Sequence, residues 1–270
     1  MLRLPSRLLH AAVRGLAAWA LPLALVVAWE TASLAGLLPA RVLPAPSDVA
    51  MAFWQNLRNR TLIDAAAIST ERALLGLAIG GGIGFVFGVL TGIWRGAETL
   101  LDSSMQMLRN VPHLAIIPLV ILWFGIGEEA KLFLVAIGTL FPIYLNTFHG
   151  IRTIDGGLVE MAEVYGLGRF ALFWRVILPG ALPSILVGLR YALGIMWLTL
   201  IVAETISASS GIGYMTMNAR EFLQTDVVLL GIIVYALLGK LADVLTRRIE
   251  AVALAWHPAY QADVSREARR

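Results

Sequence analysis

The sequence lacks cysteine and is poor in charged residues, and both shortages restrict what the protein can do. Without cysteine, the chain cannot form disulfides, use a thiol nucleophile or bind a metal through sulfur. No glycine-rich loop ending in lysine and serine or threonine occurs, so we expect no bound cofactor and no ATP hydrolysis by this chain alone. The four histidines are scattered without metal-ligand spacing, so no metal site is expected: His10, His113, His149 and His257.

The remaining composition is that of a membrane protein. Charged residues make up 14% of the chain and hydrophobic residues 59%, with a mean hydropathy of +0.78, whereas soluble domains are about 25% charged. The net charge of +3 comes from arginines at the ends of apolar runs, which is typical of a membrane orientation signal. We therefore expect lipid surroundings and no nucleic-acid partner.

Six apolar runs are long enough to cross a bilayer core of about 30 Å at about 1.5 Å per residue. The first run follows Arg3, Arg7 and Arg14 as a signal peptide would, but it is longer than a signal core and lacks a clear cleavage site. The sequence therefore predicts an all-α integral membrane protein with six transmembrane helices, at 15–38, 73–94, 110–127, 132–148, 183–204 and 227–245.

Six spans put both termini on one side of the membrane, and the lysines and arginines indicate which side. With both termini in the cytoplasm, the inside segments carry 14 of these residues, counting Lys240 near the inner end of the last span, and the outside segments carry 6. A cytoplasmic loop is then predicted at 149–182. The predicted order is a cytoplasmic tail, the first helix, a periplasmic segment, the transmembrane core and a second cytoplasmic tail, at 1–14, 15–38, 39–72, 73–245 and 246–270.

The predicted cytoplasmic loop contains the amphipathic stretch EMAEVYGLGRFALFWRVILP, residues 160–179. Its pattern predicts a short helix with Glu160 and Glu163 on the polar side, a hinge at Gly166 and Gly168, and a second short helix. A proline then begins the next span. Such a helix pair either presents a knob to a cytoplasmic partner or is an ordinary interfacial loop.

The order of residues in this stretch resembles the coupling-loop signature of permease subunits of bacterial ABC importers. That signature reads Glu-Ala-Ala, three residues, Gly, nine residues, Ile, one residue, Leu-Pro. The chain departs from it with Met161 for the second residue and Val176 for the isoleucine, and both exchanges keep an apolar side chain. The resemblance implies that the loop docks into the ATP-binding subunit and transmits its closing motion, through Glu160, Met161, Ala162, Glu163, Gly166, Leu178 and Pro179.

Longer stretches resemble the nitrate, taurine and sulfonate branch of these importers, most closely the permeases of aliphatic sulfonate importers. They include VLPAPSDV, MLRNVPHLAIIPLVILWFGIGEEAK, LFPIYLNTFHGIR and GIMWLTLIVAETISASSGIGYMTMNAREFLQTDVV. The resemblance implies a type I ABC importer permease fold in the bacterial inner membrane, working as a homodimer. It also implies two ATP-binding subunits that hold ATP and Mg²⁺, and a periplasmic sulfonate-binding protein. The implied function is ATP-driven import of alkanesulfonates for sulfur acquisition.

Three other functions stay open at this point. A permease for a related anion, such as taurine or nitrate, would share these motifs. A secondary transporter would use intramembrane carboxylates such as Glu30 and Glu204, although we see no inverted repeats in the sequence. An intramembrane hydrolase would need an activated serine, but no nucleophile-elbow pattern surrounds Ser209 or Ser210.

Two spans carry patterns that predict where their faces point. Glycines recur at every fourth residue of the second span, which favours close helix packing over nucleotide binding: Gly76, Gly80, Gly84, Gly88 and Gly92. In the fifth span, Arg190, Trp197 and Glu204 are seven residues apart and fall close to one stripe of a helix.

The stripe in the fifth span has two interpretations. Ionisable residues inside a span usually face a bundle interior or an aqueous cavity. An inward stripe would bring Arg190 to a passing sulfonate, Trp197 to its alkyl chain and Glu204 to the outer gate. Alternatively, Arg190 extends to the cytoplasmic interface and Glu204 already lies at the outer one.

Overall fold

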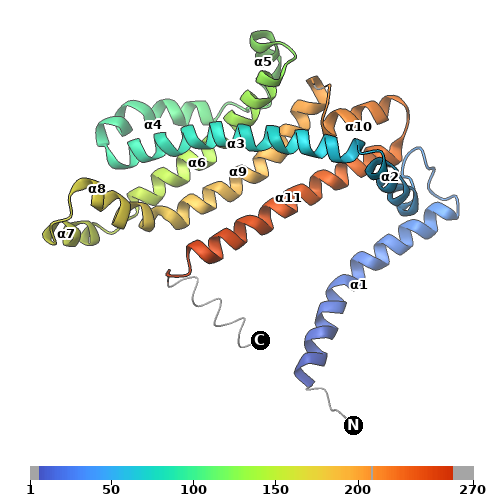
Figure 1. The fold of residues 1–270 in the computed structure, drawn as a ribbon, viewed down its shortest axis with the longest axis horizontal. Helices are drawn as coiled ribbons and strands as arrows, with labels where there is room; N and C mark the ends of the chain where they lie inside the picture. Colours follow the sequence, from blue (N-terminus) through green and yellow to red (C-terminus); the bar gives the residue numbers. More distant parts are fainter. Residues whose placement is uncertain (1–5, 208, 258–270) are drawn as a thin grey trace. The chain divides into compact units, whose positions relative to one another are not determined.

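The structure, a computed structural model, describes residues 6–207 and 209–257 (Figure 1). All regular secondary structure in these two ranges is helical. Of the predicted cytoplasmic tails, residues 1–5 and 258–270 lie outside the described residues. The helices are α1 (Ser6–Leu34), α2 (Pro46–Arg58), α3 (Thr61–Ile93), α4 (Arg95–Arg109), α5 (Ile117–Phe124), α6 (Glu128–Arg152), α7 (Gly156–Val164), α8 (Arg169–Leu172), α9 (Leu178–Ser207), α10 (Ile212–Glu221) and α11 (Thr225–Ala253).

Contacts between Cα atoms divide the chain into two compact units, which we describe separately. The first unit comprises the residues up to Asp64 together with Met215–Ile233. It contains α1, α2, most of α10 and the start of α11. The second unit comprises Ala65–Tyr214 and the residues from Val234 onward. It contains most of α3, all of α4 to α9 and most of α11.

In the first unit, α2 begins where its sequence favours a helix start. Pro46 stands in the first turn, where its missing N–H is not needed, and the carboxylate of Asp48 accepts a hydrogen bond from the backbone N–H of Ala45 at 3.2 Å. Ser47 joins α2 to α1, because its backbone N–H and its hydroxyl donate to the carboxylate of Glu30 at 3.0 and 2.7 Å. Both carboxylate oxygens of Glu30 therefore accept hydrogen bonds in the structure.

In the second unit, three long helices pack closely. α6 packs extensively against α9, and α3 lies against α6 through the five glycines at every fourth residue. α5 packs onto α6 and α9 in a small apolar cluster that contains Val120, Leu134 and Ala203. Small residues at such contacts let helix backbones approach closely inside a membrane.

Four helices of the described residues are long and apolar enough to cross a membrane: 61–93, 128–152, 169–206 and 225–253. They correspond to the second, fourth, fifth and sixth predicted spans. α1 corresponds to the first, and within its described side chains Ala20–Leu34 forms a shorter apolar stretch. The all-α membrane fold is confirmed, whereas the count of six spans is not.

The prediction of a continuous third span at 110–127 is wrong. α4 ends at Arg109, residues 110–116 form turns that include Pro112, and α5 has only 8 residues. A helix of this length covers about 12 Å, well below the thickness of a bilayer core. Gly125, with a φ of 73°, then ends α5. A hydropathy pattern detects the apolar run but not these backbone breaks, so α5 is a short helix with one buried face instead of a span.

Candidate functional site

The segment that follows α6 folds as a capped helix with a glycine hinge. The Asp155 side chain accepts a hydrogen bond from the backbone N–H of Gly157 at 2.9 Å, which starts α7. At the other end, the N–H groups of Gly166 and Leu167 donate to the carbonyl groups of Glu163 and Ala162, at 2.9 and 3.1 Å. This pair of bonds is a Schellman motif, and it requires the positive φ of 78° that Gly166 adopts.

The second short helix predicted in the loop differs from the observed structure. α8 continues through a π-helical turn, Phe173–Ile177, directly into α9. Pro179 has no N–H to donate to the carbonyl of Arg175, so the ordinary α-helical bond cannot form there. The backbone widens instead, and the N–H of Leu178 bonds to the carbonyl of Phe173. The proline therefore leaves the helix continuous from 169 to 206 instead of starting a new one.

The segment 156–177, which we call the coupling segment, presents apolar side chains to its surroundings. Ala162 is buried, whereas Glu160, Met161 and Glu163 are exposed. Large apolar side chains that are contiguous and exposed usually mark a binding surface. Six of them lie on α7, at the residue that follows it, on α8 and on the π-helical turn: Leu158, Met161, Val164, Tyr165, Phe170 and Trp174.

At the start of α6, a group of polar side chains, most of them buried, joins four of the long helices, α3, α6, α9 and α11. We call it the Arg72 cluster; its members are Ser69, Arg72, Glu128, Lys131, Glu204, Ser210 and Tyr235. The guanidinium of Arg72 donates to Glu128 at 2.5 and 2.6 Å and to Glu204 at 2.7 Å. It also donates to the carbonyl and hydroxyl oxygens of Ser210, each at 2.7 Å. All five N–H donors of the guanidinium are therefore used.

Glu204 is the most deeply buried member of the Arg72 cluster, with a side chain that is 0% exposed. Besides Arg72, its carboxylate accepts hydrogen bonds from the Ser69 hydroxyl at 2.8 Å and the Tyr235 hydroxyl at 2.7 Å. The backbone N–H of Gly213 donates to it at 2.9 Å. Because these donors come from α3, α11 and the start of α10, Glu204 anchors α9 to α3 and α11.

The stripe predicted on the fifth span faces packed protein in the second unit. Trp197 is buried and meets the ring of Tyr235 at a centroid distance of 6.2 Å. Arg190 forms an ion pair with Glu250 on α11. Glu204 lies in the Arg72 cluster, so both ionisable residues of the stripe are paired within the second unit.

A nearly apolar cavity of about 340 Å³ lies beside Trp197. It is lined by residues of α3, α9 and α11, among them Leu74, Leu193, Met196 and Leu245. The lining suits an apolar group and offers Thr70 and Thr246 as polar side chains.

The five glycines of α3 lie where a larger residue would meet α6. A Cβ built at Gly80 would overlap the carbonyl group of Ala136, and the other four would meet Val135, Leu140, Thr147 and Ile151 at Gly76, Gly84, Gly88 and Gly92, respectively. The ridge therefore brings the two helix backbones together.

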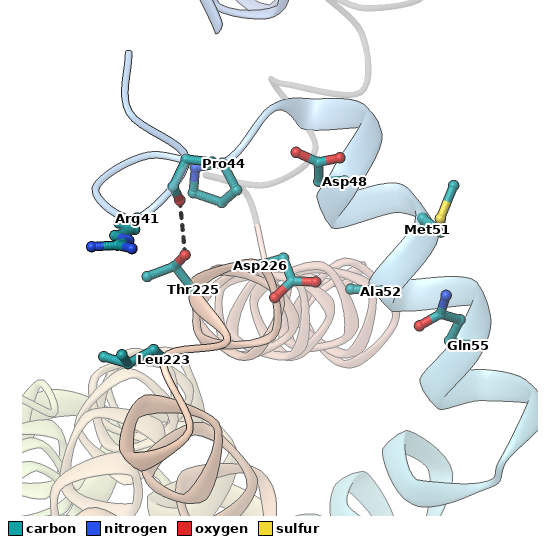
Figure 2. A pocket seen from close by; sticks show the side chains of 10 residues that line it. Arg41, Pro44, Asp48, Met51, Ala52, Gln55, Leu223, Thr225 and Asp226 are labelled. Atoms are coloured by element: carbon teal, nitrogen blue, oxygen red, sulfur yellow. Dashed lines mark hydrogen bonds between the residues drawn. The ribbon is translucent and has the colours of Figure 1, made fainter. Parts of the chain in front are cut away.

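The first unit contains a further cavity of about 300 Å³ between α2 and the start of α11 (Figure 2). The figure shows Met51 and Gln55 on α2 and Asp226 on α11 around it. The hydroxyl of Thr225 donates a hydrogen bond to the carbonyl of Ala40 at 2.9 Å. This bond holds the start of α11 against the loop that precedes α2. The lining mixes Arg41, Asp48 and Asp226 with apolar side chains.

Comparison with known proteins identifies the family. A family model described as "Binding-protein-dependent transport system inner membrane component" matches residues 80–252. The chain belongs to this family. Members of the family are membrane components of transport systems, so the chain is a multi-pass inner membrane transport component, and the resemblance read from its motifs is confirmed.

Two relatives and one solved structure illustrate the likeness. SsuC of Escherichia coli K12, provisionally named an aliphatic sulfonates transport permease protein, is 63% identical over 90% of this chain and 93% of its own. TauC of the same organism, a taurine transport system permease protein, is 36% identical over 86% of each chain. A crystal structure of an amino acid ABC transporter matches with a TM-score of 0.56 and 16% identity, over 73% of this chain and 97% of that one. This last likeness identifies the ABC transporter permease fold.

Several residues of the site were not singled out from the sequence. Arg72, Glu128 and Lys131 stand at the edges of apolar runs, where hydropathy assigns charged residues to loops. Glu250 was assigned to the cytoplasmic tail, but it is helical and paired with Arg190. One feature of the sequence pointed to these residues. Charged residues are rare beside its apolar runs, and in a membrane protein such residues usually pair with one another.

Proposed function

We propose that this chain is the permease subunit of an ATP-driven importer that carries aliphatic sulfonates across the inner membrane for sulfur acquisition. The observation that supports this most is its high identity to SsuC over nearly the whole of both chains. The lower identity to TauC makes taurine the second candidate. A secondary transporter is less favoured, because Glu204 is paired with Arg72 and Glu30 is bound by Ser47, which leaves neither carboxylate poised to bind a coupling ion.

A growth experiment tests the proposed substrate. A bacterium that lacks its own alkanesulfonate permease, but keeps the other components of that importer, should grow with hexanesulfonate as the sole sulfur source when it expresses this chain. Growth on sulfate serves as the control for general fitness. Growth on taurine but not on hexanesulfonate would assign the chain to the second candidate.

We further propose that the importer contains two copies of this chain, two ATP-binding subunits that hold ATP and Mg²⁺, and a periplasmic binding protein. The family description, which names a binding-protein-dependent system, supports the last of these. The charge distribution supports cytoplasmic termini and a cytoplasmic coupling segment. α6 ends, and α9 begins, beside that segment. Because each of these helices spans the membrane, Glu128 and Glu204 then lie toward the periplasmic end, where substrate arrives.

The coupling segment is proposed to dock on the ATP-binding subunit. Its exposed apolar side chains supply a contact surface, and the Schellman motif at Gly166 fixes the direction in which α7 presents them. The continuous helix from the π-helical turn into α9 gives a rigid path from this surface to Glu204. Motion of the docked coupling segment is thereby transmitted to the Arg72 cluster.

Gly166→Val should uncouple transport while the protein still inserts in the membrane. No atom of the described residues lies within 4 Å of a Cβ built at Gly166, so the cost comes from the backbone alone. A β-branched residue at positive φ costs about 1–2 kcal/mol, enough to shift the hinge. We expect ATP-binding subunit copurification and sulfonate-dependent growth to fall about tenfold at unchanged membrane abundance.

Gly168→Val is the matched control for the hinge. Gly168 likewise meets no described atom within 4 Å, but it has a φ of −68°, which valine adopts readily. It should behave like the parent, and Gly166→Asn should retain most activity because asparagine tolerates positive φ. Full transport by Gly166→Val would remove Gly166 from the coupling mechanism.

We also propose that the Arg190 and Trp197 stripe borders the substrate path. Arg190→Ala alone would leave Glu250 buried and unpaired, which destabilises proteins by about 3–5 kcal/mol. The informative variant is therefore Arg190→Ala combined with Glu250→Gln, alongside Trp197→Phe, which keeps an aromatic ring at this buried position. Both proteins should assemble normally and import hexanesulfonate about tenfold more slowly in proteoliposomes. Parental import rates in both would mean that this stripe is structural.

A further inference from the structure

Two buried cations in the Arg72 cluster hold a carboxylate that is half exposed. The side chains of Arg72 and Lys131 are 5% and 2% exposed, whereas that of Glu128 is 52% exposed. Arg72 Nε and Nη2 lie 2.5 and 2.6 Å from the two carboxylate oxygens, and Lys131 Nζ lies 2.9 Å from one of them. The cations are thus built into the protein, while the anion between them faces outward.

This donor set is suited to oxyanions in general. A guanidinium fork that donates two parallel N–H bonds, reinforced by an ammonium group, is a common arrangement for carboxylate, phosphate and other oxyanions. A sulfonate group carries three oxygens and one negative charge, so it can accept the same three hydrogen bonds that Glu128 accepts now. Glu128 is in this sense an internal substitute for a sulfonate.

A cavity of about 370 Å³ opens beside these groups. Arg72, Glu128 and Ser210 line its polar part, and Ile68, Leu75 and Leu132 line its apolar part. A ligand with an anionic head and a short alkyl tail matches this division. Cavities of about 300–1,000 Å³ hold small ligands, so a short-chain alkanesulfonate fits the available space.

We infer that Glu128 occupies an oxyanion site that the head group of an alkanesulfonate takes over during import, with the alkyl chain against Ile68, Leu75 and Leu132. The inference rests on the proposed function and adds a substrate site to it. Arg72 and Lys131 are balanced by Glu128 and Glu204. Exchange of one monoanion for another leaves this balance unchanged.

Only one of the two carboxylates can leave the site easily. Glu204 is completely buried and held by four groups, so its release would expose an unpaired charge to the protein interior. Glu128 stands at the first position of α6 and is already half hydrated, so its rotation into water costs far less desolvation. The exchange therefore leaves the anchor at Glu204 intact.

Glu71 restrains the affinity of this site. It is exposed and lines the same cavity, where its negative charge repels an arriving anion. Together with competition from Glu128, this repulsion keeps binding weak. A transport site must bind its substrate and release it again, so weak binding suits a transient stop on the path.

The test measures hexanesulfonate binding to the full-length chain in lipid nanodiscs, without the binding protein. Glu128→Gln removes the competing charge and should tighten binding about tenfold, since charge-assisted hydrogen bonds are roughly twice as strong as neutral ones. Lys131→Met should weaken binding about tenfold. Ethanesulfonate should bind at least tenfold more weakly than hexanesulfonate, because it has four fewer methylenes against the apolar wall.

Asp243→Asn is the matched control, because Asp243 likewise lies between a lysine and an arginine, Lys240 and Arg247, at 3.3 and 3.1 Å. It should leave binding unchanged, and size-exclusion profiles should verify that each variant is folded. Equal binding by Glu128→Gln and the parent, or no binding by either, would overturn the inference. If binding fails in this way while the parent still supports growth on hexanesulfonate, only the site is refuted and the proposed function stands.

Discussion

Glu204→Ala is expected to abolish stable folding of the permease core. The substitution removes the acceptor for Arg72, Ser69, Tyr235 and the backbone N–H of Gly213, all of which are held in the second unit. Removing one partner of a buried ion pair costs about 3–5 kcal/mol, and native proteins are stable by only about 5–15 kcal/mol. We expect loss of most folded protein, measured by thermal unfolding of detergent-solubilised protein on size exclusion.

Two further variants separate charge from shape in this prediction. Glu204→Gln keeps the size of the side chain but not its charge, so its loss of stability should lie between that of the parent and that of Glu204→Ala. Glu30→Ala is the matched control, because Glu30 accepts hydrogen bonds from Ser47 but is only half-buried. It should cost less than about 1 kcal/mol. A Glu204→Ala protein as stable as Glu30→Ala would show that the cluster does not hold these helices together.

Gly80→Ala is expected to have the second largest effect, although it adds a single methyl group. The new Cβ would overlap the backbone carbonyl of Ala136, which cannot move aside as a flexible side chain could. α3 would have to shift away from α6, and overpacking of this kind costs about 1–3 kcal/mol or more. The melting temperature should fall, and assembly with the partner subunits should fall with it.

The control for this contact is Gly82→Ala in the same helix. Gly82 is exposed, and none of the described atoms lies within 4 Å of a Cβ built there. Alanine favours a helix over glycine by about 1 kcal/mol, so this variant should be neutral or slightly more stable than the parent. A loss of stability in Gly80→Ala, together with no loss in Gly82→Ala, would establish the close approach of α3 to α6. Equal changes in stability would contradict it.

The sequence predicted the features that depend on local pattern. The four-residue glycine repeat specifies one face of a helix, and that face lies against α6. The position of Gly166 after an amphipathic turn predicted a hinge, and its φ of 78° is one that glycine adopts without strain. Both follow from residues within a few turns of each other.

Features that depend on distant partners could not be predicted in the same way. Arg72 and Glu204 are 132 positions apart, so nothing local signals that they pair. Hydropathy placed Arg72 in a loop because charge is costly in lipid, yet helix α3 extends back to Thr61 and buries it beside two carboxylates. The prediction of the third span was wrong for the opposite reason. There the residues are apolar enough for a span, but breaks in the backbone, which hydropathy does not detect, interrupt the helix.

The most direct test of the account is uptake of radiolabelled hexanesulfonate by proteoliposomes that contain this chain, the ATP-binding subunits and the sulfonate-binding protein. We predict accumulation that requires ATP and every component, and that unlabelled alkanesulfonates inhibit much more strongly than taurine or nitrate. Uptake that prefers taurine or nitrate, or that an ion gradient drives without ATP, would contradict the central claim that the chain is the permease of an ATP-driven alkanesulfonate importer.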